Sequence, residues 1–183
     1  MSTATTTTSL PAGTWHIDTH HSEVAFTVRH LMSKVRGTFE NFAGTITTVE
    51  GDPTQSKVQA TVEMSSVNTR SPQRDGHLRS SEIFNAETNP QMTFRSTKIT
   101  EDDGSYVITG DLTINGVTKQ QDFAAEFLGV DVDMANATRL GVEATTTIVR
   151  KDFGVDFNIP LDGGKFVIGD KAQVTLTIEA VLA

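Results

Sequence analysis

Apolar and polar residues alternate with a period of two along most of the chain after residue 14. The segment 57–64 reads Lys-Val-Gln-Ala-Thr-Val-Glu-Met, so Ala60 faces one side of it and Thr61 the other. This pattern is typical of a β-strand with one side in the protein interior and one side in water. It recurs in the segments 23–30, 91–99, 106–114, 121–127, 140–149 and 174–182.

Turn sequences between the strands indicate that neighbours in the sequence pair antiparallel. Asp102-Asp103-Gly104 and Asn115-Gly116 each separate two alternating runs and predict β-hairpins. The segment 36–49 reads as one strand of 14 residues, in which Gly44 is expected to permit a bend or bulge. With eight or nine strands of this kind, the sequence predicts an all-β fold closed into an antiparallel barrel.

The segment that starts at Ser71 breaks the β pattern. Ser71 is a favourable N-cap, and Pro72 suits the first position of a helix. Gly76 weakens the helix, so we expect it to be short. A second turn is expected after the helix, and it ends before Pro90. We predict a short helical insertion at about residues 71–84 that caps one end of the barrel.

The interior of such a barrel has two possible states. Barrels of about eight strands either fill with side chains or hold one small ligand. The inward positions mix large residues, such as Phe94 and Phe123, with small ones, such as Ala60 and Ala144. This mixture fits a narrow lengthwise tunnel, and it also fits a closed core in which small residues offset bulky neighbours.

The chain has 183 residues, no cysteine and a formal net charge of −8. Its length fits one domain, which we place at residues 14–183 behind a disordered N-terminal tail at residues 1–13. The lack of cysteine excludes disulfides, thiol nucleophiles and cysteine-ligated metal centres.

The negative charge disfavours nucleic acid as a partner, and the absence of any run of about 20 apolar residues disfavours stable membrane insertion. Residues 1–12 lack the basic and apolar parts of a secretory signal, so we expect a cytoplasmic protein, or a periplasmic or secreted one if a leader was removed.

Several short motifs occur in a distinctive order. They are Trp15-His16-Ile17-Asp18, Phe26-Thr27-Val28-Arg29-His30, Arg74-Asp75-Gly76-His77-Leu78, Gly110-Asp111-Leu112-Thr113-Ile114 and Arg150-Lys151-Asp152-Phe153-Gly154. This succession, over about residues 14–182, resembles the YceI-like family. The resemblance implies an extended, lipocalin-like barrel of eight antiparallel strands with a helical insertion, and the binding of polyisoprenoids or isoprenoid quinones in a long apolar pore. The sequence departs from many members in showing no leader, and it has Asn85 where an aspartate is expected.

From the resemblance we expect non-enzymatic binding, storage or transport of a long-chain isoprenoid lipid, either a polyprenyl diphosphate or an isoprenoid quinone. No cofactor other than this lipid is expected. One alternative is a small isomerase or hydrolase that acts on such a lipid with His30 or His77 as acid–base catalyst, and an inert structural barrel is another. The inward positions expected to line the tunnel are Phe26, Val28, His30, Phe39, Phe42, Ala60, Val62, Phe94, Ile108, Leu112, Phe123, Phe127, Ala144, Leu176 and Ile178.

Basic residues near the expected pore are candidates to contact a lipid head group, because guanidinium pairs well with phosphate oxygens. The candidates are Arg36, Arg74, His77 and Arg150. Their ordinary alternative is ion pairing, in which Arg74, Asp75 and His77 tie the insertion to the barrel rim, and Arg36 and Arg150 pair with Asp18, Asp75 or Asp152.

The histidines allow both a binding and a structural interpretation. His30 faces inward by period, so it is either a head-group anchor or a core histidine that bonds to the backbone or to Asp18. The five histidines are scattered, and we expect no metal site, because zinc needs about three or four converging ligands. The segment 152–154 is expected to form a turn whose Phe153 plugs one end of the barrel. The resemblance and the exposed edges of such barrels point to a homodimer.

Overall fold

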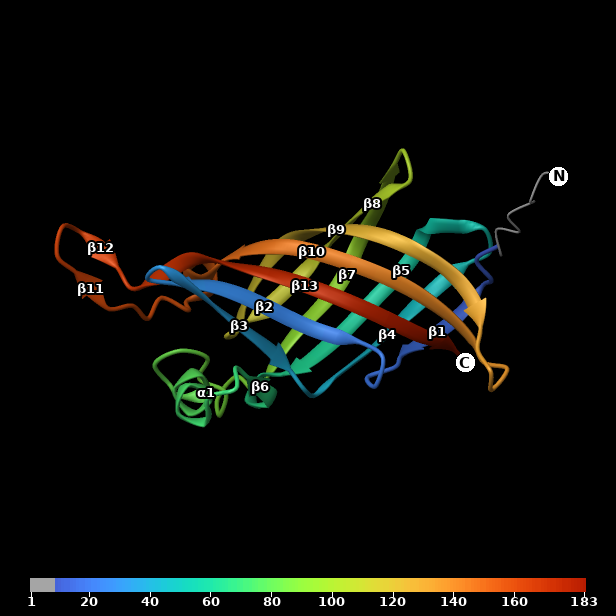
Figure 1. Ribbon diagram of the computed structural model, residues 1–183. Helices are drawn as coiled ribbons and strands as arrows, with labels where there is room; N and C mark the ends of the chain where they lie inside the picture. Colours follow the sequence, from blue (N-terminus) through green and yellow to red (C-terminus); the bar gives the residue numbers. More distant parts are fainter. Residues whose placement is uncertain (1–8) are drawn as a thin grey trace.

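The computed structural model describes residues 9–183, in which antiparallel strands wrap around one elongated barrel (Figure 1). The strands are β1 (Gly13–Ile17), β2 (Glu23–His30), β3 (Ser33–Phe39), β4 (Phe42–Val49), β5 (Asp52–Glu63), β6 (Val67–Asn68), β7 (Gln91–Asp102), β8 (Ser105–Ile114), β9 (Val117–Val132), β10 (Thr138–Val149), β11 (Pro160–Leu161), β12 (Lys165–Phe166) and β13 (Ile168–Leu182). The helical segments of this part of the chain are η1 (Met64–Ser66), α1 (Pro72–Arg79) and η2 (Arg150–Phe153). Within the same residues, no helix is both long and apolar enough to cross a membrane.

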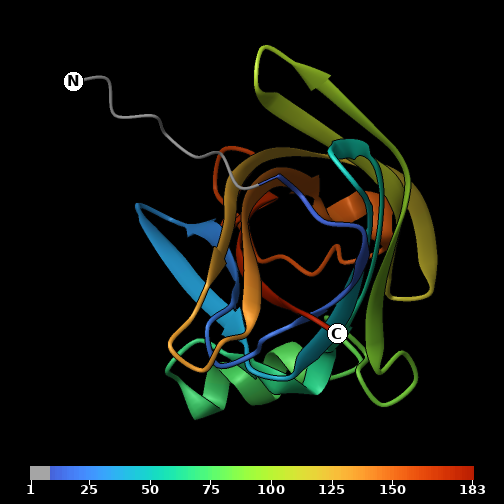
Figure 2. The ribbon, with the colours of Figure 1, turned by 90° about the vertical axis from the view of Figure 1, so that its right-hand side faces the viewer.

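Eight strands close into a ring in the order β1-β4-β5-β7-β8-β9-β10-β13, because β1 pairs with both β4 and β13. Trp15 lies opposite Ile46 of β4 on one side and opposite Leu182 of β13 on the other. A view along the barrel shows this ring of strands, with α1 outside it (Figure 2). The predicted eight-stranded antiparallel barrel is therefore confirmed.

The two predicted hairpins are also present. Asp103-Gly104 joins β7 to β8, Asn115-Gly116 joins β8 to β9, and all four residues have positive φ. That backbone suits two-residue turns of type I′, in which both central residues need a positive φ and Asp-Gly or Asn-Gly is favoured.

The predicted single strand at residues 36–49 is wrong, because the chain divides it into β3 and β4. Glu40 and Asn41 separate the two strands. Glu40 N donates to Ser66 O at 3.1 Å, and Asn41 O accepts from Glu63 N at 2.9 Å. The backbone therefore leaves the ladder here to bind the end of β5 and the turn that follows it.

The predicted bulge at Gly44 is not found there, because the register shift of β4 against β5 lies between Thr47 and Val49. Gly44 lies inside β4, opposite Ala60 of β5. A Cβ atom added at this position would lie 2.6 Å from Ile17 Cδ1 and 2.7 Å from the backbone oxygen of Gln59. The glycine therefore permits close packing of β1 against β4, which is a common use of glycine within a strand.

The helical insertion lies beside the end of the barrel where β3 has only the two-residue strand β6 as its second neighbour. Ser71 Oγ accepts from Arg74 N at 3.3 Å, which confirms the predicted N-cap. The Asp75 carboxylate accepts from Thr69 N at 2.9 Å and from Thr69 Oγ1 at 2.6 Å, and this fixes the helix to the end of β6. Turns continue after α1, so the predicted insertion at about residues 71–84 is confirmed.

The ordered chain starts before residue 14, where the sequence predicts the domain to begin. β1 already starts at residue 13, and Leu10 is buried. Trp15 Nε1 donates to Thr48 Oγ1 at 2.8 Å, and Thr48 Oγ1 donates to Pro11 O at 2.6 Å. These bonds hold the segment before β1 against the barrel. The remaining part of the predicted tail, residues 1–8, lies outside the described residues.

Candidate functional site

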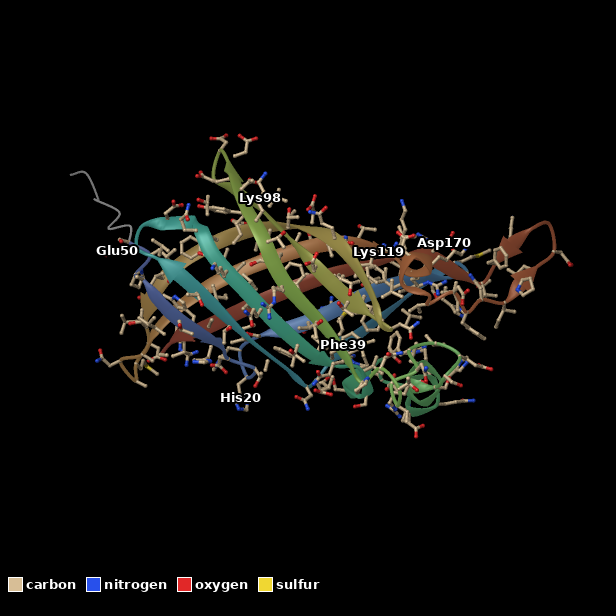
Figure 3. All side chains as sticks on the ribbon, turned by 180° about the vertical axis from the view of Figure 1, so that it is seen from behind. His20, Phe39, Glu50, Lys98, Lys119 and Asp170 are labelled. Carbon is tan, nitrogen blue, oxygen red and sulfur yellow. The ribbon has the colours of Figure 1, made fainter. Side chains whose placement is uncertain are left out.

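The barrel interior contains two apolar cavities. The first lies in the closed part of the barrel and contains about 1380 Å³ of space free of protein atoms, including its opening to solvent. The second lies towards α1 and η2 and contains about 1040 Å³ on the same measure. Phe39, which lines the second cavity, lies where the barrel meets the insertion (Figure 3). Apolar side chains make up most of the lining of both cavities.

Every position that we predicted to line a tunnel borders one of these two cavities. The second cavity is lined by Phe26, Val28, His30 and Phe39. The first cavity is lined by Phe42, Ala60, Val62, Phe94, Ile108, Leu112, Phe123, Phe127, Ala144, Leu176 and Ile178. The period-two pattern found these residues because each strand of the barrel has one lumen face. Their contact with a lipid stays a prediction.

The two cavities adjoin along the barrel. Met92, Ile148 and Val174 line both of them, from β7, β10 and β13 respectively. We did not single out these residues from the sequence, although Met92 and Val174 share the lumen face of Phe94 and Leu176. The interior therefore holds two adjoining apolar cavities that share three lining residues, where we expected either one tunnel or a closed core.

Glycines in the barrel wall make room for aromatic rings. Gly37 lies opposite Phe26, and a Cβ atom added there would be 2.4 Å from Phe26 Cζ. A Cβ atom added at Gly110 would similarly be 2.5 Å from Phe94 Cζ. Each ring therefore occupies the place of an absent side chain and lies against the strands. The neighbouring Phe123 packs edge-on against Phe94, with ring centroids 5.0 Å apart.

The two cavities differ in charge. Among the described residues, the lining of the first includes no ionisable side chain other than Tyr106. The charged or titratable side chains that line the second are all basic, and no described Asp or Glu lines it. They are Arg29, His30, Arg74 and Arg150. The second cavity is therefore a local basic environment in a protein of net charge −8.

Arg150 is the most deeply buried of these basic residues, with 9% of its surface exposed. Its Nε donates to Gly169 O at 2.8 Å, and its Nη1 donates to Val155 O at 2.8 Å and Phe157 O at 3.3 Å. Its Nη2 has no hydrogen-bond acceptor within residues 9–183. Burial lowers the pKa of the Arg150 guanidinium, while the charges of Asp170 and Asp156 act in the opposite direction. Arginine stays protonated in proteins, so a full positive charge lies in this wall.

The other three head-group candidates have different surroundings. Arg74 lines the second cavity, and its Nε and Nη2 donate to Thr69 Oγ1 and O at 2.7 and 2.8 Å. Arg36 lies outside both cavities and pairs with Glu23 at 2.6 Å, so the expected position at the pore is wrong. The expected partners of Arg36, which were Asp18, Asp75 and Asp152, are wrong as well.

His77 also does not line either cavity. Its Nε2 lies 2.6 Å from Glu82 Oε2, and its ring packs edge-on against Phe157 with the centroids 4.8 Å apart. Both His77 and Glu82 are exposed. The contact between His77 and Glu82 therefore stays within the insertion, and Arg74 and Asp75 make the hydrogen bonds from the insertion to Thr69 at the end of β6.

His30 lies at the rim of the second cavity and is exposed, so the structural alternative of a buried core histidine is wrong. Asp18, its suggested partner, instead contacts Arg139 and His21. The residue ends β2, next to the β2–β3 turn, where the strand leaves the packed interior. Phe153 is the last residue of η2; it is buried and lines the same cavity, which agrees with the expected position at one end of the barrel.

A separate ion-pair network lies where β10 meets β13, and the sequence did not reveal it. Arg139 Nη1 donates to Asp18 Oδ2 and Glu179 Oε1, both at 2.7 Å, and Arg139 Nε donates to Asp133 Oδ2 at 2.5 Å. These contacts lower the pKa of Asp18 and Asp133 and raise the pKa of Arg139. Asp18, His21 and Glu179 offer ligand atoms within 4.8 Å of one another. Arg139 bonds to the carboxylates of both Asp18 and Glu179, so these side chains form an ion-pair network.

Comparisons with known proteins place the sequence in a family. The sequence profile of the YceI-like domain matches residues 15–180. The chain belongs to the YceI-like family. It is 38% identical to the protein YceI of Salmonella arizonae over 179 residues, which cover 96% of this chain and 91% of that protein. It is 35% identical to a UPF0312 protein of Staphylococcus epidermidis over 167 residues, which cover 90% of this chain and 95% of that protein.

Solved structures share the barrel. The YceI protein of Campylobacter jejuni is 29% identical, with a TM-score of 0.70 over 85% of this chain and 90% of that one. BcnA of Burkholderia cenocepacia gives a TM-score of 0.77 at 21% identity, over 89% of this chain and 98% of that one. A polyisoprenoid-binding domain of Saccharophagus degradans gives 0.66 at 15% identity, over 94% of this chain and 99% of that one. At these low identities the last two matches show the fold alone.

Proposed function

We propose that this YceI-like protein binds a long-chain isoprenoid lipid in its barrel and stores or transports it without chemical change. The observation that carries the proposal is the pair of adjoining apolar cavities, which form one long apolar lumen. A polyisoprenoid tail is long, apolar and unbranched apart from methyl groups, and it gains free energy in proportion to the apolar area removed from water. The polyisoprenoid-binding domain of Saccharophagus degradans, which has the same fold, supports this ligand class.

A carrier agrees better with the site than the enzyme alternative. The two histidines considered as acid–base catalysts are not brought together: His30 lies at the cavity rim, and His77 pairs with Glu82 outside the cavity lining. General acid–base catalysis requires the catalytic group within hydrogen-bond reach of the reacting atom. Of the two, only His30 borders the lumen, and it has no side chain that orients it among residues 9–183.

Two tryptophan substitutions on adjacent residues of β10 test the proposal. Ala144 is buried and lines the first cavity between Ala125 and Leu176, whereas Thr145 is exposed on the outer face. We expect Ala144→Trp to fill the lumen and remove bound lipid, and Thr145→Trp to leave lipid binding unchanged. The measurement is the amount of lipid per chain by organic extraction and mass spectrometry, beside a thermal melt of each variant.

The result also separates a carrier from a packed barrel. If the lumen normally holds no lipid, Ala144→Trp should lose about 1–3 kcal/mol of stability by overpacking, and neither the parent nor Thr145→Trp should release an isoprenoid. Lipid recovered intact at near-equal molar amount from the parent supports a carrier. Equal lipid content in all three proteins, or recovery of a processed lipid, contradicts the proposal.

A further inference from the structure

Strands β5 and β7 are neighbours in the barrel, but they separate over much of their length. Each strand has 12 residues, and the ladder between them joins only residues 59–63 of β5 to residues 91–95 of β7. Beyond it, residues 52–58 belong to the hairpin with β4 and residues 96–102 to the hairpin with β8. The two hairpins diverge and form a fork, which is visible where β7 and β8 project away from β5 (Figure 1).

A β-bulge and one side chain mark the point of separation. The ladder between β7 and β8 shifts register between Ser96 and Lys98, and a bulge bends the strand that carries it. Ser96 Oγ accepts from Val58 N at 2.8 Å, so this bond joins the two strands next to the end of their ladder. Thr97, the extra residue of the bulge, donates to Thr109 O at 3.3 Å within the β7–β8 hairpin.

The first cavity reaches the fork from inside the barrel. Pro53, Ser56 and Val58 line the cavity from β5, and Ile99 and Tyr106 line it from the β7–β8 hairpin. All five are half-buried, and no Asp, Glu, Lys, Arg or His of the described chain lines this cavity. An apolar chain can therefore pass between the two strand edges without removing water from a charged group, which would be costly.

Both ends of the lumen are less suited to the passage of an apolar chain. At one end, Leu10, Trp15 and Leu140 belong to one buried cluster. At the other end, Phe153 of η2 is buried, and the exposed rim beside the β2–β3 turn carries the charge of Arg29. A chain that entered at this rim would also have to cross the second cavity before it reached the first.

We propose that the fork between β5 and β7 is a lateral portal through which an isoprenoid chain enters and leaves the first cavity. The inference rests on the proposed function, because it supplies a path for the bound lipid. Within residues 9–183, the bond between Ser96 and Val58 is the only hydrogen bond that joins the diverging stretches. Outward movement of the β7–β8 hairpin therefore breaks one bond and leaves the ladder intact, which suits an element that gates ligand exchange.

Removal of this bond tests the portal. Retinol, an isoprenoid alcohol whose fluorescence changes in an apolar site, is mixed with the full chain in a stopped-flow instrument. Ser96 lines neither cavity, so Ser96→Ala should raise the association and dissociation rate constants of retinol together, by about two- to tenfold, and change the Kd by less than about twofold. Thr97→Ala is the matched control, because the bond that it removes stays within the β7–β8 hairpin; it should leave both rate constants unchanged.

Closure of the fork should have the opposite effect. The chain has no cysteine, so Gln55→Cys and Thr100→Cys, which are both exposed, can be joined across the fork by a bismaleimide. The crosslinked protein should bind and release retinol at least about tenfold more slowly with a nearly unchanged Kd, because a gate alters the barrier and not the bound state. The matched control joins Thr145→Cys to Thr175→Cys, which lie exposed and opposite each other in the continuous β10–β13 ladder; this crosslink should change neither rate constant.

The outcomes separate the portal from the carrier. Normal retinol affinity with unchanged rate constants in Ser96→Ala and in the crosslinked protein would overturn the portal and leave the carrier intact. Met32→Cys carrying a polyethylene glycol maleimide tests the other route, because Met32 is exposed in the β2–β3 turn; strong slowing by this group would also overturn the portal. Failure of the parent to bind retinol would contradict the proposed function itself. Circular dichroism of each variant confirms that folded proteins are compared.

Discussion

Thr48→Val should weaken the closed end of the barrel through the only tryptophan of the chain. Trp15 is fully buried, and its Nε1 donates to Thr48 Oγ1 at 2.8 Å. Valine has nearly the shape of threonine, so the change creates little cavity and removes mainly the hydroxyl. It leaves the indole N–H without an acceptor and takes from Pro11 O the bond that Thr48 donates at 2.6 Å. A buried polar group left unsatisfied costs about 1–3 kcal/mol of stability. In a protein of this length, each kcal/mol of lost stability lowers the Tm by about 2–4 °C, so we expect a Tm lower by about 2–12 °C.

The same tryptophan provides the assay. Urea denaturation followed by Trp15 fluorescence reports the free energy of unfolding at the place where the bond is lost, and circular dichroism reports the whole barrel. Thr47→Val is the matched control, because Thr47 is exposed on the same strand and should change stability by less than about 0.5 kcal/mol. Equal stability of Thr48→Val and the parent would refute the argument that this hydroxyl satisfies Trp15.

Two further substitutions probe parts of the fold outside the cavities. Arg139 holds the pKa of Asp18 well below its usual range, so this contact stabilises the protein above about pH 4, and the stabilisation is lost as the pH falls further. Asp18→Asn should lower the free energy of unfolding by about 1.5–3 kcal/mol at pH 7. In urea titrations, the variant should lose less of this free energy than the parent between pH 7 and pH 3. Identical pH dependence in the parent and the variant would contradict this. Gly76→Ala should raise the Tm by about 1–4 °C, because alanine has a higher helix propensity than glycine in α1. An added Cβ atom would have only Arg79 Nη2 near it, at 3.9 Å. A lower Tm would show a constraint that the helix geometry does not reveal.

The regular part of the barrel was predictable from the sequence because its side chains follow one rule. Each strand of a closed sheet has a lumen face and an outer face, so Ala60, Phe94 and Leu176 were assigned by counting in twos. The turns were equally local, since the positive φ of Asn115 and Gly116 follows from the turn type that joins two such strands. Neither assignment needs knowledge of which residues meet across the barrel.

The errors arose where distant segments decide the local structure. The break between β3 and β4 occurs because Glu40 N and Asn41 O bind Ser66 and Glu63, which are more than twenty residues away and have no signature in the sequence of the segment itself. The assignment of Arg36 to the pore failed for a similar reason. Its partner Glu23 lies across the β2–β3 ladder, on the outer face that Arg36 shares with Thr27.

Arg150 was a candidate from the sequence, but its hydrogen-bond partners were not predictable. Its neighbour Lys151 is also a cation, but Lys151 lies 3.3 Å from Asp170 on the surface, whereas Arg150 is buried. Asp170 lies at the same end of the barrel, on the outside (Figure 3). The difference continues the alternation of β10, in which Ala144, Thr146 and Ile148 are buried and Thr145, Thr147 and Val149 are exposed. Beside Arg150, β13 is irregular, with a register shift against β2 between Ile168 and Ala172.

That irregularity releases a backbone carbonyl from the sheet. Gly169 O lies within the shifted stretch and accepts from Arg150 Nε, while the turn of η2 presents Val155 O to Nη1. A strand that kept its register would use the carbonyl in its own ladder and would leave a buried guanidinium with too few acceptors. The period-two pattern of β10 therefore predicts that Arg150 faces inward, but it carries no signal for the β-bulge and the 3-10 turn that supply its acceptors.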